Sequence, residues 1–141
     1  MKIFIVNGPN LNMLGKREPE IYGHDTLESI NAQLSEFCKE LGVEPEFYQS
    51  NCEGEIIDII HSARDNADGI VLNAGAYTHY SIAIRDAISA AETPCIEVHL
   101  SNVHNREEFR RTSMISAVCK GVICGFGIDS YRFAIMALAK K

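Results

Sequence analysis

Polar side chains gather at three places where an apolar, strand-like run of the sequence ends. They occupy residues 7–10 after the first run, residues 73–81 after a later one and residues 97–102 within and after a third. Asparagine amides bind hydroxyl and carbonyl groups, and histidine and glutamate side chains transfer protons. The three clusters indicate where the chemistry of this chain would lie, whereas the fold alone does not predict which chemistry it is.

His99 lies in an apolar run two residues after Glu97. Side chains two apart share one face of a strand, so Glu97 is placed to hold and charge the imidazole. A histidine in an apolar strand is, taken alone, more often a buried structural residue. His79, His99 and Glu97 also offer metal ligands, but they come from two strand ends and form no short ligand motif, so we expect no metal.

Residues 11–24 form a segment longer than the usual connection between a strand and a helix. Gly15 and Gly23 lie near its ends, and Arg17 and Tyr22 lie between them. Taken alone, the segment is more simply a solvated charged loop. Its position after the first strand, above the expected crevice, favours an active-site lid.

Runs of strand length alternate with helical patterns along the chain, which is typical of a parallel sheet covered on both faces. Residues 3–6, 70–72 and 122–124 are uninterrupted apolar runs, and residues 96–100 form a fourth run. A fifth run, residues 43–48, contains Pro45 and alternating glutamates. We expect it at an edge of the sheet, because proline cannot donate to a ladder of hydrogen bonds.

Apolar residues at helical spacing predict helices between these strands. The first of them has its apolar face made by Leu27, Ile30, Leu34, Phe37, Cys38 and Leu41. Asp25 or Thr26 is placed to cap its start, and Gly42 to end it. Further helices are predicted over residues 56–63, 82–88 and 128–138.

The alternation predicts one α/β domain over residues 1–141, with a five-stranded, doubly wound parallel sheet. An edge second strand and a central first strand fit the flavodoxin-like order 2-1-3-4-5, whose crevice lies at the carboxyl ends of the strands. Strands 1, 3 and 4 are neighbours in this order. The three polar segments therefore converge on one crevice.

The composition and net charge limit the binding partners and the cellular compartment that we expect. The formal net charge is −6 and the pI is about 5.3, which disfavours nucleic acid and anionic membranes as partners. The first residues are too briefly apolar for a signal peptide, and nothing later resembles a membrane span. The five cysteines are an odd number and form no C-x-x-C pair, so we expect neither a disulfide framework nor a zinc site. Cys38, Cys95 and Cys124 fit as small apolar core residues. We therefore expect a cytoplasmic protein.

Two other uses of such a crevice fit less well. A phosphate cradle for a nucleotide or flavin needs a glycine-rich turn that leads directly into a helix, whereas Pro9 removes a donor here and the next helix is distant. A phosphorylated receiver domain needs acidic residues after the first strand, where this chain has asparagines.

Four segments together resemble the type II dehydroquinases. They are residues 7–23, which read NGPNLNMLGKREPEIYG; residues 49–55; residues 73–87; and residues 97–111. The segments occur in the family's order and span nearly the whole chain. Cys52 stands where the family suggests a residue such as histidine, and His104 lies at a variable position, but neither is a catalytic position.

The resemblance implies a dehydratase that converts 3-dehydroquinate to 3-dehydroshikimate by anti elimination of water through an enolate. It assigns the general base to Tyr22, and Arg17 supplies the cation that ionises a tyrosine at neutral pH. His99 becomes the general acid, with Glu97 as its partner, and Asn10 positions a water on the enolate oxygen.

The resemblance also assigns the substrate contacts. It places Asn73, His79 and Arg110 on hydroxyl groups, and Ser101 with the Leu100 and Ser101 amides on the carboxylate. It places Asp86 in the site of a neighbouring subunit, in trimers that group into a homododecamer, and it implies no cofactor. Five further basic residues are expected to be solvated or structural, namely Lys16, His24, His61, Arg106 and Arg111. A non-catalytic small-molecule binder of the same fold remains the alternative from another class, and a flavin or nucleotide binder is the third.

Overall fold

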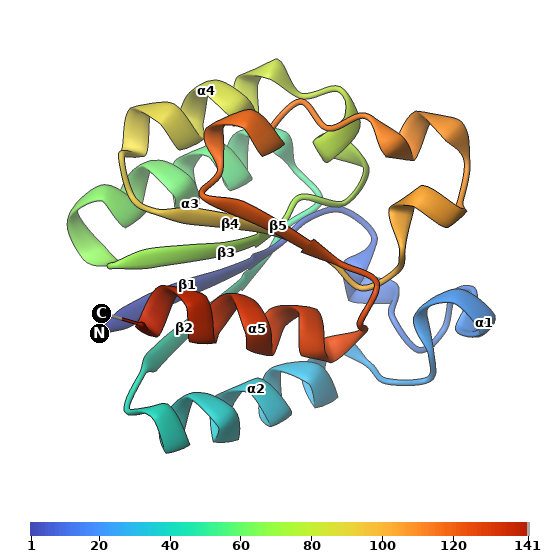
Figure 1. Ribbon diagram of the computed structural model, residues 1–141, viewed down its shortest axis with the longest axis horizontal. Coiled ribbons are helices and arrows are strands. Elements are labelled where there is room, and N and C mark those ends of the chain that lie inside the picture. The colour runs from blue at the N-terminus through green and yellow to red at the C-terminus, as the bar shows by residue number, and fades with distance from the viewer. Residues whose placement is uncertain (141) are drawn as a thin grey trace.

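The computed structural model describes residues 1–140, except for the side chain of Tyr22, and contains one five-stranded parallel sheet (Figure 1). The strands are β1 (Lys2–Asn7), β2 (Glu44–Gln49), β3 (Gly69–Asn73), β4 (Cys95–His99) and β5 (Gly121–Cys124). Their order is β2-β1-β3-β4-β5, which confirms the predicted topology. Strand β2, which contains Pro45, lies at an edge as expected.

Five α-helices connect and follow the strands: α1 (Pro19–Tyr22), α2 (Leu27–Leu41), α3 (Glu53–Asn66), α4 (Ile82–Ala91) and α5 (Ile128–Ala139). The predicted helices α2, α3, α4 and α5 are present, with ends that differ by a few residues from the apolar patterns. The one-turn helix α1 was not predicted, because four residues carry no helical period.

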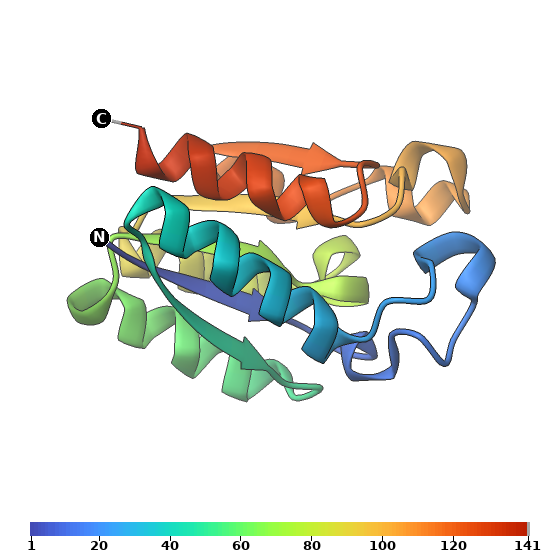
Figure 2. The ribbon, with the colours of Figure 1, turned by 90° about the horizontal axis from the view of Figure 1, so that it is seen from below.

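Helices α2 and α5 cover one face of the sheet, and α3 and α4 cover the other (Figures 1 and 2). Alternate residues of β1 divide between the two cores: Ile3 and Ile5 pack with the α2 and α5 side, and Phe4 and Val6 with the α3 and α4 side. Strands buried on both faces need apolar residues throughout, which explains their uninterrupted runs.

The ends of α2 follow from local chemistry. The Thr26 hydroxyl accepts a hydrogen bond from the Ser29 N–H at 3.1 Å, so Thr26 is the capping residue. Gly42 ends the helix at φ 71°, in the left-handed region that glycine enters most readily. The helix is thereby fixed between the lid segment and β2.

The cysteines lie largely as predicted. Cys38 and Cys95 are buried, Cys124 is half-buried, and all five thiols are free. Burial raises the pKa of the Cys38 thiol to about 11, which makes it an unreactive core residue. Among the described helices, none is long and apolar enough to cross a membrane.

The carboxyl ends of β1 and β3 are held tightly together. The Gly8 N–H donates to the Asn73 carbonyl at 2.7 Å, and a Cβ on Gly8 would lie 2.7 Å from the backbone of Ala74. Only glycine allows this approach. The contact brings the polar segments after the two strands side by side, as the topology predicts.

Candidate active site

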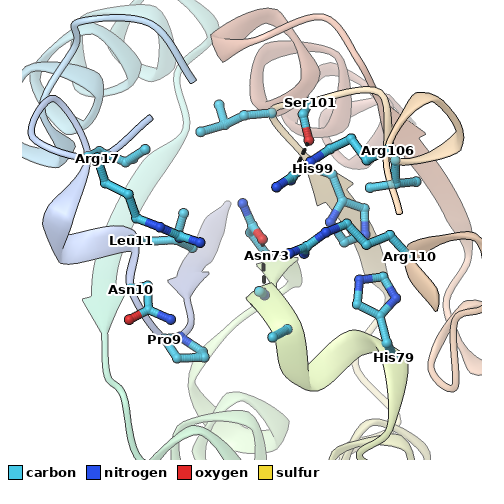
Figure 3. Close-up of a pocket in the computed structure, with 15 residues that line it drawn as sticks. Pro9, Asn10, Leu11, Arg17, Asn73, His79, His99, Ser101, Arg106 and Arg110 are labelled. Atoms are coloured by element: carbon cyan, nitrogen blue, oxygen red, sulfur yellow. Dashed lines mark hydrogen bonds between the residues drawn. The ribbon is translucent and has the colours of Figure 1, made fainter. Parts of the chain in front are cut away.

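A pocket opens at the carboxyl ends of β1, β3 and β4 (Figure 3). It is lined by Pro9, Asn10, Leu11, Leu14, Arg17, Asn73, Gly75, Ala76, His79, His99, Leu100, Ser101, Val103, Arg106 and Arg110. The lining therefore comes from the three polar segments that the sequence singled out, from residues 11–17, and from the segment that follows β4, which adds Val103, Arg106 and Arg110.

Positive charge converges on this pocket. Arg17 reaches toward the centre of the pocket from the segment after β1, and Arg106 and Arg110 approach from the opposite wall (Figure 3). Of the described residues that line it, none is Asp or Glu, although the chain carries a net charge of −6. Guanidinium groups favour carboxylate and phosphate ligands, so the pocket is suited to a small anion.

Eight of the predicted site residues line the pocket, namely Asn10, Arg17, Asn73, His79, His99, Leu100, Ser101 and Arg110. Glu97 lies behind His99 and is buried. Asp86 lies exposed on α4 and is not part of the lining, so its proposed role in a neighbouring subunit stays a prediction. The side chain of Tyr22 lies outside the described part of the structure.

Glu97 and His99 form a buried pair on β4. The His99 Nε2 lies 2.6 Å from the Glu97 Oε2, and both side chains are buried. Because a carboxylate only accepts, Nε2 carries the proton in this bond, and Nδ1 is the ring nitrogen left for a ligand. The carboxylate is thereby placed to hold the imidazole ring in one orientation.

The second oxygen of Glu97 is held by two serines that follow the polar segments in sequence. The Ser113 and Ser116 hydroxyls donate to Oε1 at 2.9 and 2.5 Å. Burial raises the pKa of Glu97, but the hydrogen bonds from His99, Ser116 and Ser113 outweigh it, and the pKa lies below its ordinary value. Glu97 is therefore a carboxylate at neutral pH despite its burial.

The ring of His79 lies next to the ring of His99 in the pocket wall, and a different ring nitrogen is bonded to the protein. Its Nδ1 donates to the Thr112 carbonyl at 2.8 Å, which leaves Nε2 for a ligand. Desolvation lowers the pKa of His79, and the nearby His99 and Arg110 lower it further against the effect of the Thr112 carbonyl. His79 is therefore neutral at pH 7, and its Nε2 accepts hydrogen bonds.

Asn73 is oriented by a buried network between β1, β3 and α5. Its Nδ2 donates to the Tyr131 hydroxyl at 2.9 Å, and that hydroxyl donates to the Asn7 Oδ1 at 2.5 Å. The Asn73 Oδ1 accepts from the Gly75 N–H at 3.1 Å. Burial raises the pKa of Tyr131, so its hydroxyl stays protonated. It therefore holds the side-chain amides of Asn7 and Asn73 in fixed orientations.

Asn10 is presented to the pocket by an unusual backbone conformation. Its φ is 70°, a left-handed conformation that asparagine tolerates better than most residues. The Asn10 N–H donates to the Asn51 Oδ1 at 3.0 Å, and Gln49 donates to the same oxygen at 3.1 Å. Residues 49–55, the second segment of the resemblance, thus hold the backbone of Asn10 in the first segment in place.

The segment of residues 11–24, the predicted lid, is anchored at its base and contacts the opposite wall. Leu11 and Leu14 are buried in the core, whereas the one-turn helix α1 projects outward beyond the sheet (Figure 2). An Arg106 guanidinium nitrogen lies 3.8 Å from a carboxylate oxygen of Glu18. This ion pair links the segment to the wall that carries Arg106 and Arg110.

Arg106, which was expected to be solvated or structural, is not solvated. Its side chain is only 11% exposed, it lines the pocket, and it donates to the Ser101 hydroxyl at 3.2 Å. Lys16, His24, His61 and Arg111 are exposed and outside the lining.

Sequence reasoning did not single out Ser113 and Ser116, which hold Glu97, or Tyr131, which holds Asn73. Serine and tyrosine are common residue types, and nothing in their local sequence indicates a distant partner. In residues 1–140 with described side chains, no group of three or more His, Cys, Asp or Glu residues is arranged to hold a metal ion.

The fold and the pocket define an α/β protein with an arginine-lined crevice and a carboxylate-backed histidine. The family profile described as dehydroquinase class II matches residues 1–139. A 3-dehydroquinate dehydratase of Carboxydothermus hydrogenoformans is 57% identical over 98% of this chain and 90% of its own length. A 3-dehydroquinate dehydratase of Geotalea daltonii is 58% identical over 98% of this chain and 96% of its own.

A solved structure gives the same assignment. The crystal structure of a type II dehydroquinase from Butyrivibrio crossotus matches with a TM-score of 0.97 and 53% identity, and covers 99% of this chain and 98% of that one. The chain therefore belongs to the class II dehydroquinase family, and the resemblance found in the sequence is confirmed.

Proposed function

We propose that this protein is a dehydratase that converts 3-dehydroquinate into 3-dehydroshikimate and water. The observation that carries the proposal is the pair of His99 and Glu97, which opens into an arginine-lined pocket in a chain of this family. 3-Dehydroquinate carries a carboxylate, several hydroxyls and a ketone. An anion-binding pocket with amide and imidazole groups matches those features.

The substrate is held by its polar groups. Ser101 and the backbone amides of Leu100 and Ser101 bind the carboxylate, next to Arg106. Asn73, His79 and Arg110 bind the hydroxyls, and the neutral His79 accepts from one of them at Nε2. The fixed amide of Asn73 supports this assignment, because its orientation is set before the ligand arrives.

The first chemical step removes a proton next to the ketone. Tyr22, in its ionised form, takes the proton, and Arg17 favours that form with its positive charge. The electron pair of the broken C–H bond moves onto the ketone oxygen and gives an enolate. Asn10 positions a water molecule that donates to the enolate oxygen.

The second step expels the hydroxyl from the carbon that carries the carboxylate. The enolate collapses to restore the ketone and form a carbon–carbon double bond, while the His99 imidazolium donates its Nδ1 proton to the departing hydroxyl. The products are 3-dehydroshikimate and one water molecule. The proton held on Tyr22 returns through solvent to His99, so both groups regain their starting states.

The wider setting follows from the same assignment. The reaction belongs to the shikimate pathway of aromatic amino-acid biosynthesis, and we place the protein in the cytoplasm. It acts without metal or cofactor as a single domain, with residues 11–24 as the lid. It assembles as trimers grouped into a homododecamer, in which Asp86 reaches the site of a neighbouring subunit.

The experiment that tests the proposal is an absorbance assay with 3-dehydroquinate. The product has a carbon–carbon double bond conjugated with its ketone, and it absorbs ultraviolet light that the substrate does not. A steady rise in absorbance that depends on enzyme concentration supports the dehydratase. Binding without any rise would favour a non-catalytic binding module, and a yellow purified protein would favour a flavin binder.

A further inference from the structure

The carboxylate of Glu97 is held by a short segment, residues 112–116, that has no part in the proposed steps. Ser116 donates to the Glu97 Oε1 at 2.5 Å, and Ser113 donates to the same oxygen at 2.9 Å. A carboxylate oxygen accepts about two strong hydrogen bonds, so these serines occupy Oε1 and leave Oε2 to His99.

The Ser113 hydroxyl is itself fixed in direction. It accepts hydrogen bonds from the Ile115 N–H at 3.2 Å and the Ser116 N–H at 3.0 Å. A hydroxyl has one hydrogen to donate, and here that hydrogen points to Glu97. The local turn therefore sets the direction of the bond to the carboxylate.

The 112–116 segment is also tied to the rest of the wall. The Met114 N–H donates to the Thr78 carbonyl at 2.8 Å, and Arg85 donates to the Met114 carbonyl at 3.0 Å. Ile115 is fully buried in the core. At its start, the Thr112 carbonyl accepts from His79. One anchored segment thus contacts His79 at one end and the partner of His99 at the other.

We propose that Ser113 and Ser116 are positioning residues for the general acid. They hold Glu97 ionised and turned so that Oε2 faces the His99 Nε2, which directs the protonated Nδ1 of His99 into the pocket. The inference rests on the proposed function for its catalytic consequence, but the state of Glu97 is measurable without turnover.

The electrostatic reason is the burial of Glu97. Burial alone favours the neutral acid, and the serine hydroxyls are two of the groups that reverse this preference. The titratable and charged groups around the carboxylate include His99 on the same strand, His79 with its neighbour Arg110 on the pocket wall, and the Cys95 thiol at the start of β4. A neutral Glu97 would no longer stabilise an imidazolium on His99.

The test compares Ser113→Ala, Ser116→Ala and the double variant with the wild-type protein. Carbon NMR of selectively labelled glutamate follows the ionisation of Glu97, whose signal is assigned by its loss in Glu97→Gln. Ser81→Ala is the matched control, because Ser81 donates to the Glu53 carboxylate at the same distance of 2.5 Å, and neither residue lines the pocket. Ser116→Thr keeps a hydroxyl at this position and is the conservative variant.

In the double variant, we expect the Glu97 signal to titrate at higher pH than in the wild type. We also expect kcat to fall about tenfold or more while KM stays within about twofold, because neither serine lines the pocket. Ionised Glu97 is needed for the step, and its pKa rises, so the acidic limb of the kcat profile moves to higher pH. Ser116→Thr, which keeps the hydroxyl, should retain most of the kcat that Ser116→Ala loses.

Ser81→Ala is expected to lower the thermal midpoint without moving the Glu97 signal. If the folded double variant titrates Glu97 as the wild type does, the proposal is wrong, whatever its activity. If the wild-type protein does not turn over 3-dehydroquinate, the proposed function fails, while the NMR titration still decides whether the serines control Glu97.

Discussion

The imidazole rings of His79 and His99 lie stacked, with centroids 6.2 Å apart and planes 17° from parallel. His79 donates through Nδ1 to the Thr112 carbonyl, and His99 contacts Glu97 through Nε2. The two rings therefore turn different nitrogens to the pocket, Nε2 on His79 and Nδ1 on His99. Desolvation, together with the nearby His99, lowers the pKa of His79, which fits the proposed roles of substrate binding for His79 and proton donation for His99.

Replacing Glu97 by glutamine tests the origin of this difference. Glutamine keeps the shape but loses the negative charge, and its amide nitrogen donates to the His99 Nε2, so the ring becomes neutral. We expect kcat to fall about a hundredfold or more with little change in KM, because Glu97 lies behind the pocket lining.

Steady-state kinetics of Glu97→Gln measure this loss, and thermal unfolding verifies that the variant is folded. Glu55→Gln, an exposed change on α3, is the control and should behave as the wild type. An unchanged kcat in Glu97→Gln would remove Glu97 from the catalytic machinery.

The pKa of His79 gives a prediction for stability against pH. In the unfolded chain a histidine takes up its proton near pH 6.5, whereas the pKa of folded His79 is lower, mainly through desolvation. Above about pH 6.5 the residue is neutral in both states. As the pH falls below that value, the unfolded chain binds the proton first, so the folded protein loses stability.

His79→Gln should therefore lose less stability than the wild type between about pH 6.5 and the lower pKa of folded His79. Denaturant unfolding at several pH values measures the difference. The exposed change His61→Gln is the control and should leave the difference in place. Equal acid sensitivity of wild type and His79→Gln would mean that His79 is not held neutral by the fold.

Arg17 and Tyr22 are predicted to act as one unit in the lid segment. Tyr22→Phe removes the base, and Arg17→Ala removes the charge that favours the tyrosinate, at a cost of about 3 kcal/mol or a hundredfold in kcat. The double variant should be little slower than the worse single variant, because residues that act through one another are strongly non-additive.

Rapid kinetics of the two single variants and the double variant measure this coupling. Lys16→Ala, which removes an exposed cation from the same segment, is the control. Defects that multiply in the double variant would show independent roles, and near-normal kcat in Tyr22→Phe would exclude Tyr22 as the base.

The fold was predictable because its determinants are local. The uninterrupted runs in β1 and β3, the proline in β2 and the glycine after α2 each reflect a short-range rule of burial or backbone conformation. The order of the strands then placed Asn10, Asn73 and His99 at one edge. The helix α1 was not predicted, because a single helical turn leaves no periodic pattern in the sequence.

The supporting contacts of the site were not predictable in the same way. Tyr131 reaches Asn7 and Asn73 from α5, 124 and 58 positions away along the chain, and Ser113 meets Glu97 from a separate segment. Such contacts depend on how elements pack in three dimensions. The burial of Arg106 was not predictable for the same reason, because only the folded wall turns its side chain toward Ser101.

Asp86 provides a prediction about assembly. It is exposed on α4 and outside the pocket lining of its own chain, so it contributes to catalysis only if a second subunit brings it into a site. Asp86→Asn should raise KM, and light scattering should show an active species much larger than a monomer. Asp58→Asn, exposed on α3, is the control, and a fully active monomer would remove Asp86 from the site.

The most direct test of the account is turnover of 3-dehydroquinate by the wild-type protein after exhaustive dialysis against a chelator. Absorbance follows the conjugated product while calorimetry follows substrate binding to His99→Ala. We predict saturable product formation by the dialysed wild-type protein, and binding with almost no turnover by the variant. Substrate binding to the wild-type protein without product, or activity that returns only with an added metal ion, would contradict a metal-free dehydratase centred on His99.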